Sequence, residues 1–459
     1  MFQINFECPC HIYFIGIGGI SMSGLAEILL SRGFSVSGSD LTESPLTKRL
    51  SQKGAVIYYG QSISHITEDV DVVVYTAAIH PDNAEFLAMQ ERQLPHLTRA
   101  QLLGQLMKNY EYPIAVAGTH GKTTTTSMIA EILMASDTDP TLSIGGILPS
   151  IGGNIRVGSS PYFLTEACEY TNSFLSFFPR IGIILNVEED HMDFFRDLED
   201  IRSSFRSFAK LLPEDGTLIL NDEIADGEAL TKDLACSVIT YGFSPGCDYR
   251  ASQISYDKDG RPAFLVTCKG APDRRLSLGV AGRHNISNAL AAIALADLLG
   301  LPEDSLRKAL SSFTGTKRRF EYKGRLGDIT VMDDYAHHPT EITVTLEAAK
   351  QLPHSRIVCI FQPHTYSRTK AFLSQFARAL AAADVVVLAD IYASRETDSL
   401  GISSLDLLRE LKLLGKECVH FPTFDEIENY LLENSINGDL LITMGAGDIV
   451  KVGESLLGI

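Results

Sequence analysis

The sequence lacks several features that would assign it to other classes of protein. Its 459 residues contain no run of eighteen apolar residues, which argues against an ordinary membrane-spanning helix. Lysine and arginine number 39 against 57 aspartates and glutamates, so the net charge of -18 would repel nucleic acid and anionic membranes. The eight cysteines include no C-x-x-C pair, and no basic segment followed by an apolar stretch opens the sequence. These absences predict a cytoplasmic protein with reduced thiols, no nucleic-acid partner and no membrane insertion.

Three stretches of the chain alternate short apolar runs with helical patterns. The first covers residues 11 to about 108, the second opens at Pro113, and the third follows "GTKRRFE". Runs that are apolar on both faces, such as Val72 to Tyr75, are typical of parallel strands covered by helices on both sides. A Gly- and Asp-rich stretch between about 214 and 275 predicts hairpins added to the central sheet. The length fits about three α/β domains, and ligands of such sheets bind at the carboxyl ends of the strands.

The stretch "AVAGTHGKTTTT", residues 115 to 126, resembles the phosphate loop G-x-x-x-x-G-K-[ST], with Val116 in the place of the first glycine. Gly118 and Gly121 free the backbone to wrap around phosphate, and Lys122 can place its charge on the β and γ oxygens. Thr123 offers a hydroxyl where Mg2+ would sit. A strand before the loop and a helix after it complete the pattern, so the segment predicts a site for a nucleotide with Mg2+.

A second glycine-rich turn, "GIGGISMSG", follows the first predicted strand. Gly18 and Gly19 allow a diphosphate to approach the start of the next helix, and Asp40 can accept hydrogen bonds from a ribose or base. A dinucleotide fingerprint has a third glycine where this chain has Ser21. The departure favours a nucleotide diphosphate over a nicotinamide cofactor, and a tight turn without a ligand remains the alternative.

Acidic residues follow two strands of the middle segment. "TEACEY" places Glu166 and Glu169 at one strand end, and "NVEEDHMD" places acids and His191 at another. Taken alone, such clusters are as often solvated as functional. Beside a phosphate loop, carboxylate oxygens and an occasional imidazole favour a Mg2+ site.

Polar side chains in the later segments fit either binding or local structure. His284 and Asn285 of "GRHNISNALAA" can cap the apolar helix that follows or grip an adenine. "DDYAHHPTE" and "QPHTYSRT" bring His337, His364 and Arg368 to one sheet edge, as a site or as loop residues with local hydrogen bonds. Their position at strand ends in successive units favours a site.

In combination and order, these motifs resemble the Mur ligase family over essentially the whole chain. The matching stretches are "GIGGISMSGLAE", "SGSD", "GTHGKTTTT", "EACEY", "NVEEDHMD", "HNISNALAA", "KRRFE", "DDYAHHPTE", "QPHTYSRT" and "MGAGDI". The resemblance implies three α/β domains. An N-terminal Rossmann-like domain over residues 1–108 would bind a UDP sugar, a central P-loop mononucleotide-binding ATPase domain over 109–317 would bind ATP, and a C-terminal Rossmann-like domain over 318–459 would bring in an amino acid. The short loop G-T-x-G-K-[ST] is usual in this family, which accounts for Val116.

Within the family, the motifs look most like those of ligases that use ATP and Mg2+ to join L-alanine to the lactyl carboxylate of UDP-N-acetylmuramate, a step of peptidoglycan precursor synthesis. The resemblance implies an acyl phosphate intermediate and a catalytic set of Lys122, His191, Arg319 and His337. The residues implied to contact ATP are Gly118, Thr119, His120, Gly121, Lys122, Thr123, Thr124, Asn285, Asn288, Arg319 and Asp334. The implied Mg2+ ligands are Thr123, Glu166 and His191. The UDP sugar would contact Gly18, Gly19, Asp40, Thr76, Ala77, Asn154 and Arg156, and L-alanine would contact Tyr335, His337, His364 and Arg368.

Other expectations follow from the chemistry of the reaction. Water would hydrolyse an acyl phosphate, so the C-terminal domain is expected to close over the bound substrates, and His337 is a hypothetical base for the amine of L-alanine. Thr365 stands where many relatives have an arginine, so Arg368 is expected to carry the substrate carboxylate more nearly alone. A monomer or a homodimer is expected to be the working form.

Two rival functions remain open. One is a Mur-type ligase of peptidoglycan recycling that adds a whole tripeptide. The other, from a different class, is a nucleotide-binding oxidoreductase built on the Rossmann-like segments, against which the phosphate loop and the missing third glycine argue. A nucleotide-sensing protein without chemistry is disfavoured by the polar strand ends in all three segments.

Overall fold

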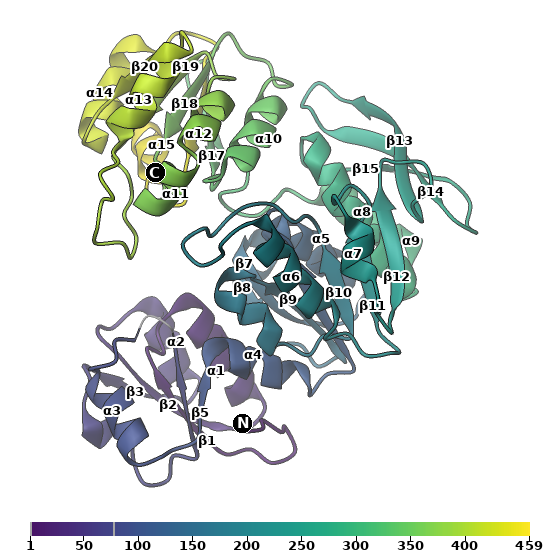
Figure 1. Cartoon of the computed structure of the whole chain (residues 1–459), viewed down its shortest axis with the longest axis vertical. Coiled ribbons are helices and arrows are strands. Elements are labelled where there is room, and N and C mark those ends of the chain that lie inside the picture. Colours follow the sequence, from purple (N-terminus) through teal and green to yellow (C-terminus); the bar gives the residue numbers. More distant parts are fainter. Residues whose placement is uncertain (1, 77–78) are drawn as a thin grey trace.

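The computed structural model describes residues 2–76 and 79–459. Three lobes follow one another along the chain, and the central lobe lies between the N-terminal and the C-terminal lobe (Figure 1). Each lobe is built on one sheet with helices around it, so the predicted α/β class with three domains is confirmed. The sheets lie inside the three predicted segments, and the boundaries at 108/109 and 317/318 stay predictions.

The N-terminal sheet has the strand order β3-β2-β1-β4-β5, and every neighbouring pair is parallel. Its strands are β1 (His11–Ile15), β2 (Ser35–Asp40), β3 (Val56–Tyr59), β4 (Val72–Tyr75) and β5 (His96–Thr98). The helices are α1 (Ile20–Ser31), α2 (Pro45–Gln52), α3 (Ala84–Glu91) and α4 (Arg99–Met107), with a short 3-10 turn η1 (Ile63–His65). Ile12 and Phe14 pack into one hydrophobic cluster and Tyr13 and Ile15 into another, so both faces of β1 are buried. Two buried faces explain the continuous apolar runs in the sequence.

The central sheet has the order β15-β14-β13-β12-β11-β10-β6-β9-β7-β8. Its strands are β6 (Tyr112–Ala117), β7 (Thr141–Leu148), β8 (Gly153–Arg156), β9 (Tyr162–Ala167), β10 (Ile181–Ile184), β11 (Thr217–Asn221), β12 (Ser237–Gly242), β13 (Tyr249–Tyr256), β14 (Pro262–Cys268) and β15 (Arg274–Ser277). The helical segments are α5 (Lys122–Ala135), α6 (Leu198–Ala209), α7 (Gly227–Thr231), α8 (Arg283–Leu298) and α9 (Glu303–Ser312), with 3-10 turns η2 (Pro149–Ile151) and η3 (Tyr170–Ser176).

The predicted hairpins of the central sheet are confirmed in one part and wrong in another. β13, β14 and β15 pair antiparallel, as expected for hairpins. β11 and β12 fall in the same stretch but join the parallel part of the sheet. Thr217 to Asn221 are all buried, and such a short apolar run has the same appearance in a hairpin and in a parallel strand.

The C-terminal sheet has the order β16-β17-β21-β18-β19-β20, and only the edge strand β16 runs antiparallel to its neighbour. Its strands are β16 (Glu321–Leu326), β17 (Ile329–Asp334), β18 (Ile357–Phe361), β19 (Val385–Leu388), β20 (Glu417–His420) and β21 (Leu440–Met444). Its helices are α10 (Pro339–Ala349), α11 (Tyr366–Ala371), α12 (Leu373–Leu380), α13 (Ser404–Leu413), α14 (Phe424–Asn434) and α15 (Val450–Leu457).

The domains are joined in two different ways. One hydrophobic cluster contains both Phe14 of the N-terminal domain and Phe163 of the central domain. At this junction α4 approaches η3 so closely that a Cβ on Gly104 would overlap the backbone oxygen of Ser176. The buried clusters of the C-terminal domain, in contrast, consist of its own residues, and Met192 of the central domain packs only at their edge. A separate core allows a domain to move relative to its neighbour.

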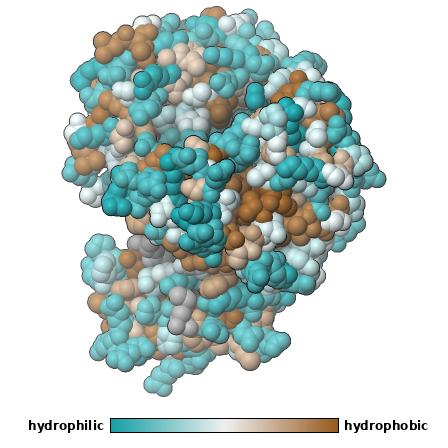
Figure 2. Space-filling model, turned by 45° about the vertical axis from the view of Figure 1, so that its right-hand side comes forward, coloured by the Kyte–Doolittle hydropathy of each residue, from teal (hydrophilic) through white to brown (hydrophobic). Residues whose placement is uncertain are grey.

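The surface agrees with the composition. On the face shown in Figure 2 the outer lobes are mostly hydrophilic, and hydrophobic residues gather near the middle of the molecule. Among the described residues, no helix combines the length and the apolar composition needed to cross a bilayer.

Candidate active site between the central and C-terminal domains

The phosphate loop connects the end of β6 to the start of α5. Gly118 has a φ of 146° and Gly121 a φ of 80°, values that side chains rarely adopt. A Cβ on Gly118 would lie 2.9 Å from the Cβ of Leu185, and one on Gly121 would lie 2.8 Å from Oδ1 of Asn288. Both glycines are therefore required by the backbone conformation and by close neighbours.

Lys122 points back into this loop. Its Nζ donates hydrogen bonds to the backbone oxygens of Gly118 and Thr119 and to Oε2 of Glu169, the last at 2.9 Å. Burial favours a neutral amine, but the negative charges around it, above all Glu169, outweigh burial and raise the pKa of Lys122. Lys122 is thus a cation held at the phosphate loop by two backbone oxygens and a carboxylate.

The predicted Mg2+ ligands gather beside Lys122. Thr123 Oγ1 donates to Glu166 Oε2 at 3.1 Å, and His191 Nε2 lies 3.5 Å from Oε1 of Glu169. That Oε1 atom is buried and accepts no hydrogen bond from the described residues. The cluster contains a hydroxyl, two carboxylates and an imidazole, and Oε1 of Glu169 is available as a ligand atom. This donor set fits Mg2+. Glu169 links Lys122 to His191 and completes this cluster.

A cavity of about 1170 Å³ opens between the central and the C-terminal domain. Residues expected at the nucleotide line its wall from both domains: His120, Gly121, Thr124, Asn285, Asn288, Arg319 and Asp334. Asn288 Nδ2 donates to Asn285 Oδ1 at 3.1 Å, so the two predicted adenine contacts lie side by side. Burial raises the pKa of Asp334 to about 6, although Arg319 opposes the shift. The structure thus brings seven of the eleven predicted nucleotide residues to one cavity, whereas Gly118, Thr119, Lys122 and Thr123 do not belong to its lining.

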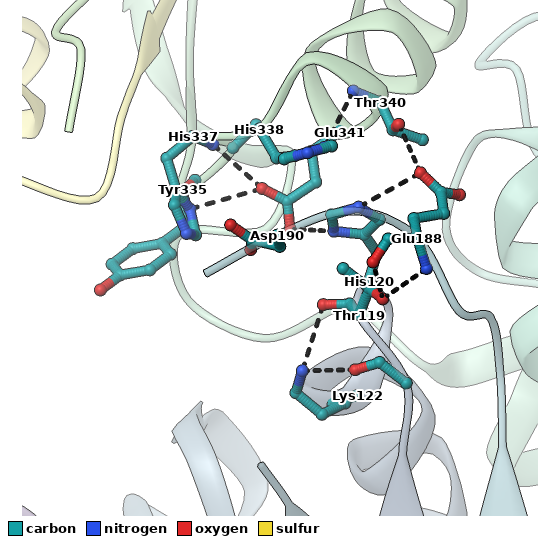
Figure 3. Close-up of polar contacts among 12 residues, drawn as sticks. Thr119, His120, Lys122, Glu188, Asp190, Tyr335, His337, His338, Thr340 and Glu341 are labelled. Carbon is teal, nitrogen blue, oxygen red and sulfur yellow. Dashed lines mark hydrogen bonds and ion pairs between the residues drawn. The ribbon is translucent and has the colours of Figure 1, made fainter. Parts of the chain in front are cut away.

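His120 of the phosphate loop contacts the C-terminal domain directly (Figure 3). Its Nδ1 is 3.2 Å from Oε1 of Glu341 in α10, and its Nε2 is 3.6 Å from Oε2 of Glu188. Glu188 also accepts a hydrogen bond of 2.6 Å from Thr340 Oγ1. Burial lowers the pKa of His120, but Glu188 and Glu341 outweigh burial and raise it to about 9. The charged imidazole therefore connects the phosphate loop to the neighbouring domain.

Three of these groups are also close enough to be considered as a metal site. Ligand atoms of His120, Glu188 and His338 lie within 4.8 Å of one another. However, Nε2 of His338 is 3.0 Å from the backbone oxygen of Glu189, and Nδ1 accepts from the backbone N–H of Thr340 at 3.3 Å. Since both ring nitrogens of His338 are engaged, we describe the group as a hydrogen-bonded domain contact.

The residues expected to receive the amino acid lie in a row. The ring centroids of Tyr335 and His337 are 5.5 Å apart, those of His337 and His364 are 5.6 Å apart, and Nδ1 of His364 is 3.1 Å from a guanidinium nitrogen of Arg368. Burial lowers the pKa of His337 to about 3, and the nearby Arg368 opposes its protonation too. His337 Nδ1 lies 2.9 Å from the backbone oxygen of Tyr335, to which it donates. His337 is therefore neutral and a weak base, with Nε2 as an acceptor.

Arg368, which is expected to carry the substrate carboxylate more nearly alone, is paired with an aspartate inside the protein. Its guanidinium donates to Oδ1 of Asp190 through two nitrogens, at 3.0 and 2.9 Å. Both side chains are less than a tenth exposed. Burial would raise the pKa of Asp190, but Arg368 and neighbouring histidines outweigh burial and lower it. An aspartate 178 residues away thus neutralises the arginine.

The residues expected at the UDP sugar lie at the N-terminal sheet and at its contact with the central domain. The Gly18 N–H donates to Oδ2 of Asp40 at 2.8 Å, so the glycine turn and the acid are in direct contact. Gly19 precedes α1, and Thr76 follows β4. Ala77 lies outside the described residues. Asn154 and Arg156 are on β8, whose Ile155 packs so closely against α1 that a Cβ on Gly24 would overlap it.

Arg156 has partners within its own domain. Its guanidinium pairs with Oδ1 of Asp139 at 2.5 Å and donates to the backbone oxygen of Pro140 at 2.8 Å. A role toward a sugar substrate would therefore require Arg156 to exchange or share these partners.

Sequence reasoning did not assign four residues of this site: Glu169, Glu188, Asp190 and Glu341. The first three were visible as acids at strand ends, but nothing in the sequence separated them from solvated carboxylates. Glu341 had only the signal of an acid in the first turn of a helix, which is common. Their partners are distant in sequence, so spacing carries no information about them.

Comparison with known proteins agrees with this geometry. Three family models match successive parts of the chain: "Mur ligase family, catalytic domain" over residues 11–111, "Mur ligase middle domain" over 116–296, and "Mur ligase, glutamate ligase domain" over 318–447. The UDP-N-acetylmuramate--L-alanine ligase of Lachnospira eligens is 59% identical over the full length of both chains. Its namesake from Clostridium botulinum is 50% identical over 97% of this chain and 96% of its own.

Solved structures give the same picture. UDP-N-acetylmuramate-alanine ligase from Thermotoga maritima superposes with a TM-score of 0.80 at 31% identity and covers 98% of both chains. A murein peptide ligase from Psychrobacter arcticus covers the same shares, with a TM-score of 0.71 at 26% identity.

Proposed function

The chain belongs to the Mur ligase family, and we propose that it joins L-alanine to the lactyl carboxylate of UDP-N-acetylmuramate in an ATP-dependent reaction. The observation that carries this proposal is the full-length identity of 59% to a ligase of that name. The geometry supports it, because a cavity that suits a nucleotide lies beside a row of groups that suits an amino acid. The product would be a precursor of peptidoglycan.

We assign the nucleotide to the large cavity. ATP would supply the phosphoryl group that turns the lactyl carboxylate into an acyl phosphate, and Mg2+ would screen the charges of the two anions. Gly118 to Thr124 would surround the phosphates, and Thr123, Glu166 and His191 would hold the metal ion. Lys122 and Arg319 would add the fixed positive charge that phosphoryl transfer to an anion demands. Asn285 and Asn288 would face the adenine, and Asp334 would complete the pocket.

The other substrates would approach from the two outer domains. Gly18, Gly19, Asp40, Thr76 and Ala77 would bind the UDP part, and Asn154 and Arg156 would lie near the muramate arm. Tyr335, His337, His364 and Arg368 would surround L-alanine. The neutral ring of His337 suits an acceptor that orients the amine, since a group with a pKa of about 3 holds a proton poorly.

We propose that the C-terminal domain closes over the substrates. Its separate hydrophobic core and its contact through His120 and Glu341 fit a domain that docks and undocks as a body. Closure would exclude water from the acyl phosphate. We further propose a cytoplasmic enzyme that works as a monomer or homodimer on small-molecule substrates.

Phosphate release from ATP tests the assignment. Purified protein would be given UDP-N-acetylmuramate with either L-alanine, L-serine, glycine or the tripeptide of the recycling ligases. We expect phosphate release that depends on both the UDP sugar and L-alanine. A requirement for the tripeptide would favour the recycling activity, and ATP left intact with every acceptor would contradict the proposal. A change in NAD absorbance under the same conditions would point to the oxidoreductase alternative.

A further inference from the structure

A second, smaller cavity lies beside the amino-acid residues. It has a volume of about 270 Å³ and is lined by residues of the central domain and by the loops that follow β18 and β19. Two arginines line it, Arg368 and Arg395. The volume is below that of pockets for drug-sized ligands, so it suits a small molecule.

The first arginine has its charge neutralised inside the protein. Arg368 is held by Asp190 on one side and by Nδ1 of His364 on the other. Breaking a buried pair of this kind leaves an uncompensated charge, which is strongly unfavourable. Arg368 therefore fixes the position of His364, and its positive charge is already balanced by Asp190.

The other two acids of the cavity wall are also engaged. The Glu396 carboxylate accepts from the backbone N–H groups of Tyr366 and Ser367, at 2.6 and 3.1 Å, and so caps the start of α11. Asp193 accepts from the hydroxyl of Tyr170 at 2.8 Å. Neither acid forms an ion pair with an arginine in the part of the chain that the structure describes.

Arg395 is thus left as a cation without a counter-charge. It is exposed and lines the cavity, and it forms no hydrogen bond or ion pair with the described residues. Its segment is nevertheless anchored: Thr365 N–H donates to Tyr392 O at 2.9 Å, and Tyr392 N–H donates to Pro363 O at 2.9 Å. Together with the cap made by Glu396, these bonds fix the segment that carries Arg395 against the start of α11, and Arg395 and His364 line the same cavity.

Thr365 also lines the cavity. Its Oγ1 accepts from the backbone N–H of Arg368 at 3.4 Å as the N-cap of α11. Its hydroxyl carries no charge. With Thr365 neutral and Arg368 paired to Asp190, the cavity has one uncompensated arginine to offer an anion.

We propose that Arg395 binds the carboxylate of the amino-acid substrate, while Arg368 acts as a positioning residue for His364. This inference rests on the proposed function, since it names the group that recognises the amino acid in that reaction. The guanidinium forms two parallel hydrogen bonds to a carboxylate and remains charged at every pH of interest. The amine would then point toward His337 and His364.

The test compares Michaelis constants in the full-length enzyme. Arg395→Gln removes the charge and keeps most of the length, and Arg395→Glu reverses the charge. We expect Arg395→Gln to raise KM for L-alanine by about 10- to 100-fold, the effect of losing a charge-assisted hydrogen bond. Arg395→Glu should raise it further, because the new carboxylate repels the substrate. Values of KM for ATP and UDP-N-acetylmuramate should change less than about threefold.

Arg409→Gln is the matched control, since Arg409 is an exposed arginine on α13 whose one ion-pair partner among the described residues is Asp406. It should leave all three Michaelis constants unchanged. An unchanged KM for L-alanine in both Arg395 variants, or an equal rise for all three substrates, would overturn the inference while the wild-type reaction still supports the proposed function. If wild-type protein shows no alanine-dependent phosphate release, both proposals fail together.

Discussion

His120 and Glu341 are 221 residues apart in sequence, and Nδ1 of the histidine lies 3.2 Å from a carboxylate oxygen of the glutamate. One residue belongs to the phosphate loop and the other to the first turn of α10, so the contact joins two domains. A loop that binds phosphate is thereby in direct contact with the domain proposed to deliver the amino acid. A ligand bound to the phosphate loop can therefore change the affinity of the C-terminal domain for its own ligand through this single charged pair.

Replacing His120 should lower the free energy of unfolding by an amount that depends on pH. The pKa of His120 is raised from 6.5 to about 9 by Glu188 and Glu341, against burial and the nearby His338. The folded state binds the proton more tightly, so the stabilisation is complete below pH 6.5 and is lost as pH rises through 9. His120→Asn should therefore lower the free energy of unfolding by up to about 3 kcal/mol at pH 6.5 and by little at pH 9.5.

Urea unfolding of wild type and His120→Asn between pH 6 and 10 measures this difference. His80→Asn serves as the control, because the His80 side chain is 84% exposed and pairs, within the described part of the chain, with the exposed Asp82. A stability difference that does not change with pH would show that His120 contributes by packing alone.

Replacing Lys122 should slow phosphate release strongly and also lower the stability of the protein. Lys122→Met removes the charge proposed to screen the phosphates, and we expect phosphate release to fall about 100-fold or more. It also leaves the buried Glu169 without its cation, which costs about 3 kcal/mol of stability. Adding Glu169→Gln to Lys122→Met should restore much of the melting temperature and none of the activity. Lys210→Met, at an exposed position after α6, is the control.

The two glycine substitutions Gly121→Ala and Gly270→Ala separate backbone strain from site geometry. The φ values are 80° and 81°, so each alanine has the same left-handed cost of about 1–2 kcal/mol. At Gly121 the new Cβ would also lie 2.8 Å from Oδ1 of Asn288, whereas at Gly270 nothing lies within 4 Å. We expect a loss of stability in both variants, at least as large in Gly121→Ala as in Gly270→Ala, and a rise of KM for ATP only in Gly121→Ala. Equal kinetics in the two variants would contradict the assignment of the loop.

Thiol reagents should react at the surface before they reach the site. Cys8 is exposed, whereas burial and the charge of Glu169 raise the pKa of Cys168. With iodoacetamide at pH 7.5 we expect Cys8 to be alkylated first while phosphate release is retained. Mass spectrometry of digested protein, taken in parallel with activity, measures the order. Early labelling of Cys168 would mean that its pocket opens to solvent.

The sequence by itself determined the parts of the protein whose chemistry is contiguous. Gly118 to Thr123 form a complete phosphate loop because its glycines, cation and hydroxyl follow one another between a strand and a helix. Apolar runs such as that of β4 specify parallel strands, since both faces must be covered. The α/β class and the three-sheet order along the chain follow from local periodicity of this kind.

The tertiary structure decided which charges are free. Asp190 pairs with Arg368 across 178 residues, whereas Arg395 has no ion-pair partner among the described residues. Glu169 and Glu341 likewise form their ion pairs with residues of other elements, Lys122 and His120. Electrostatic pairing depends on distance in space and on burial, and neither is written in the spacing of residues along a chain.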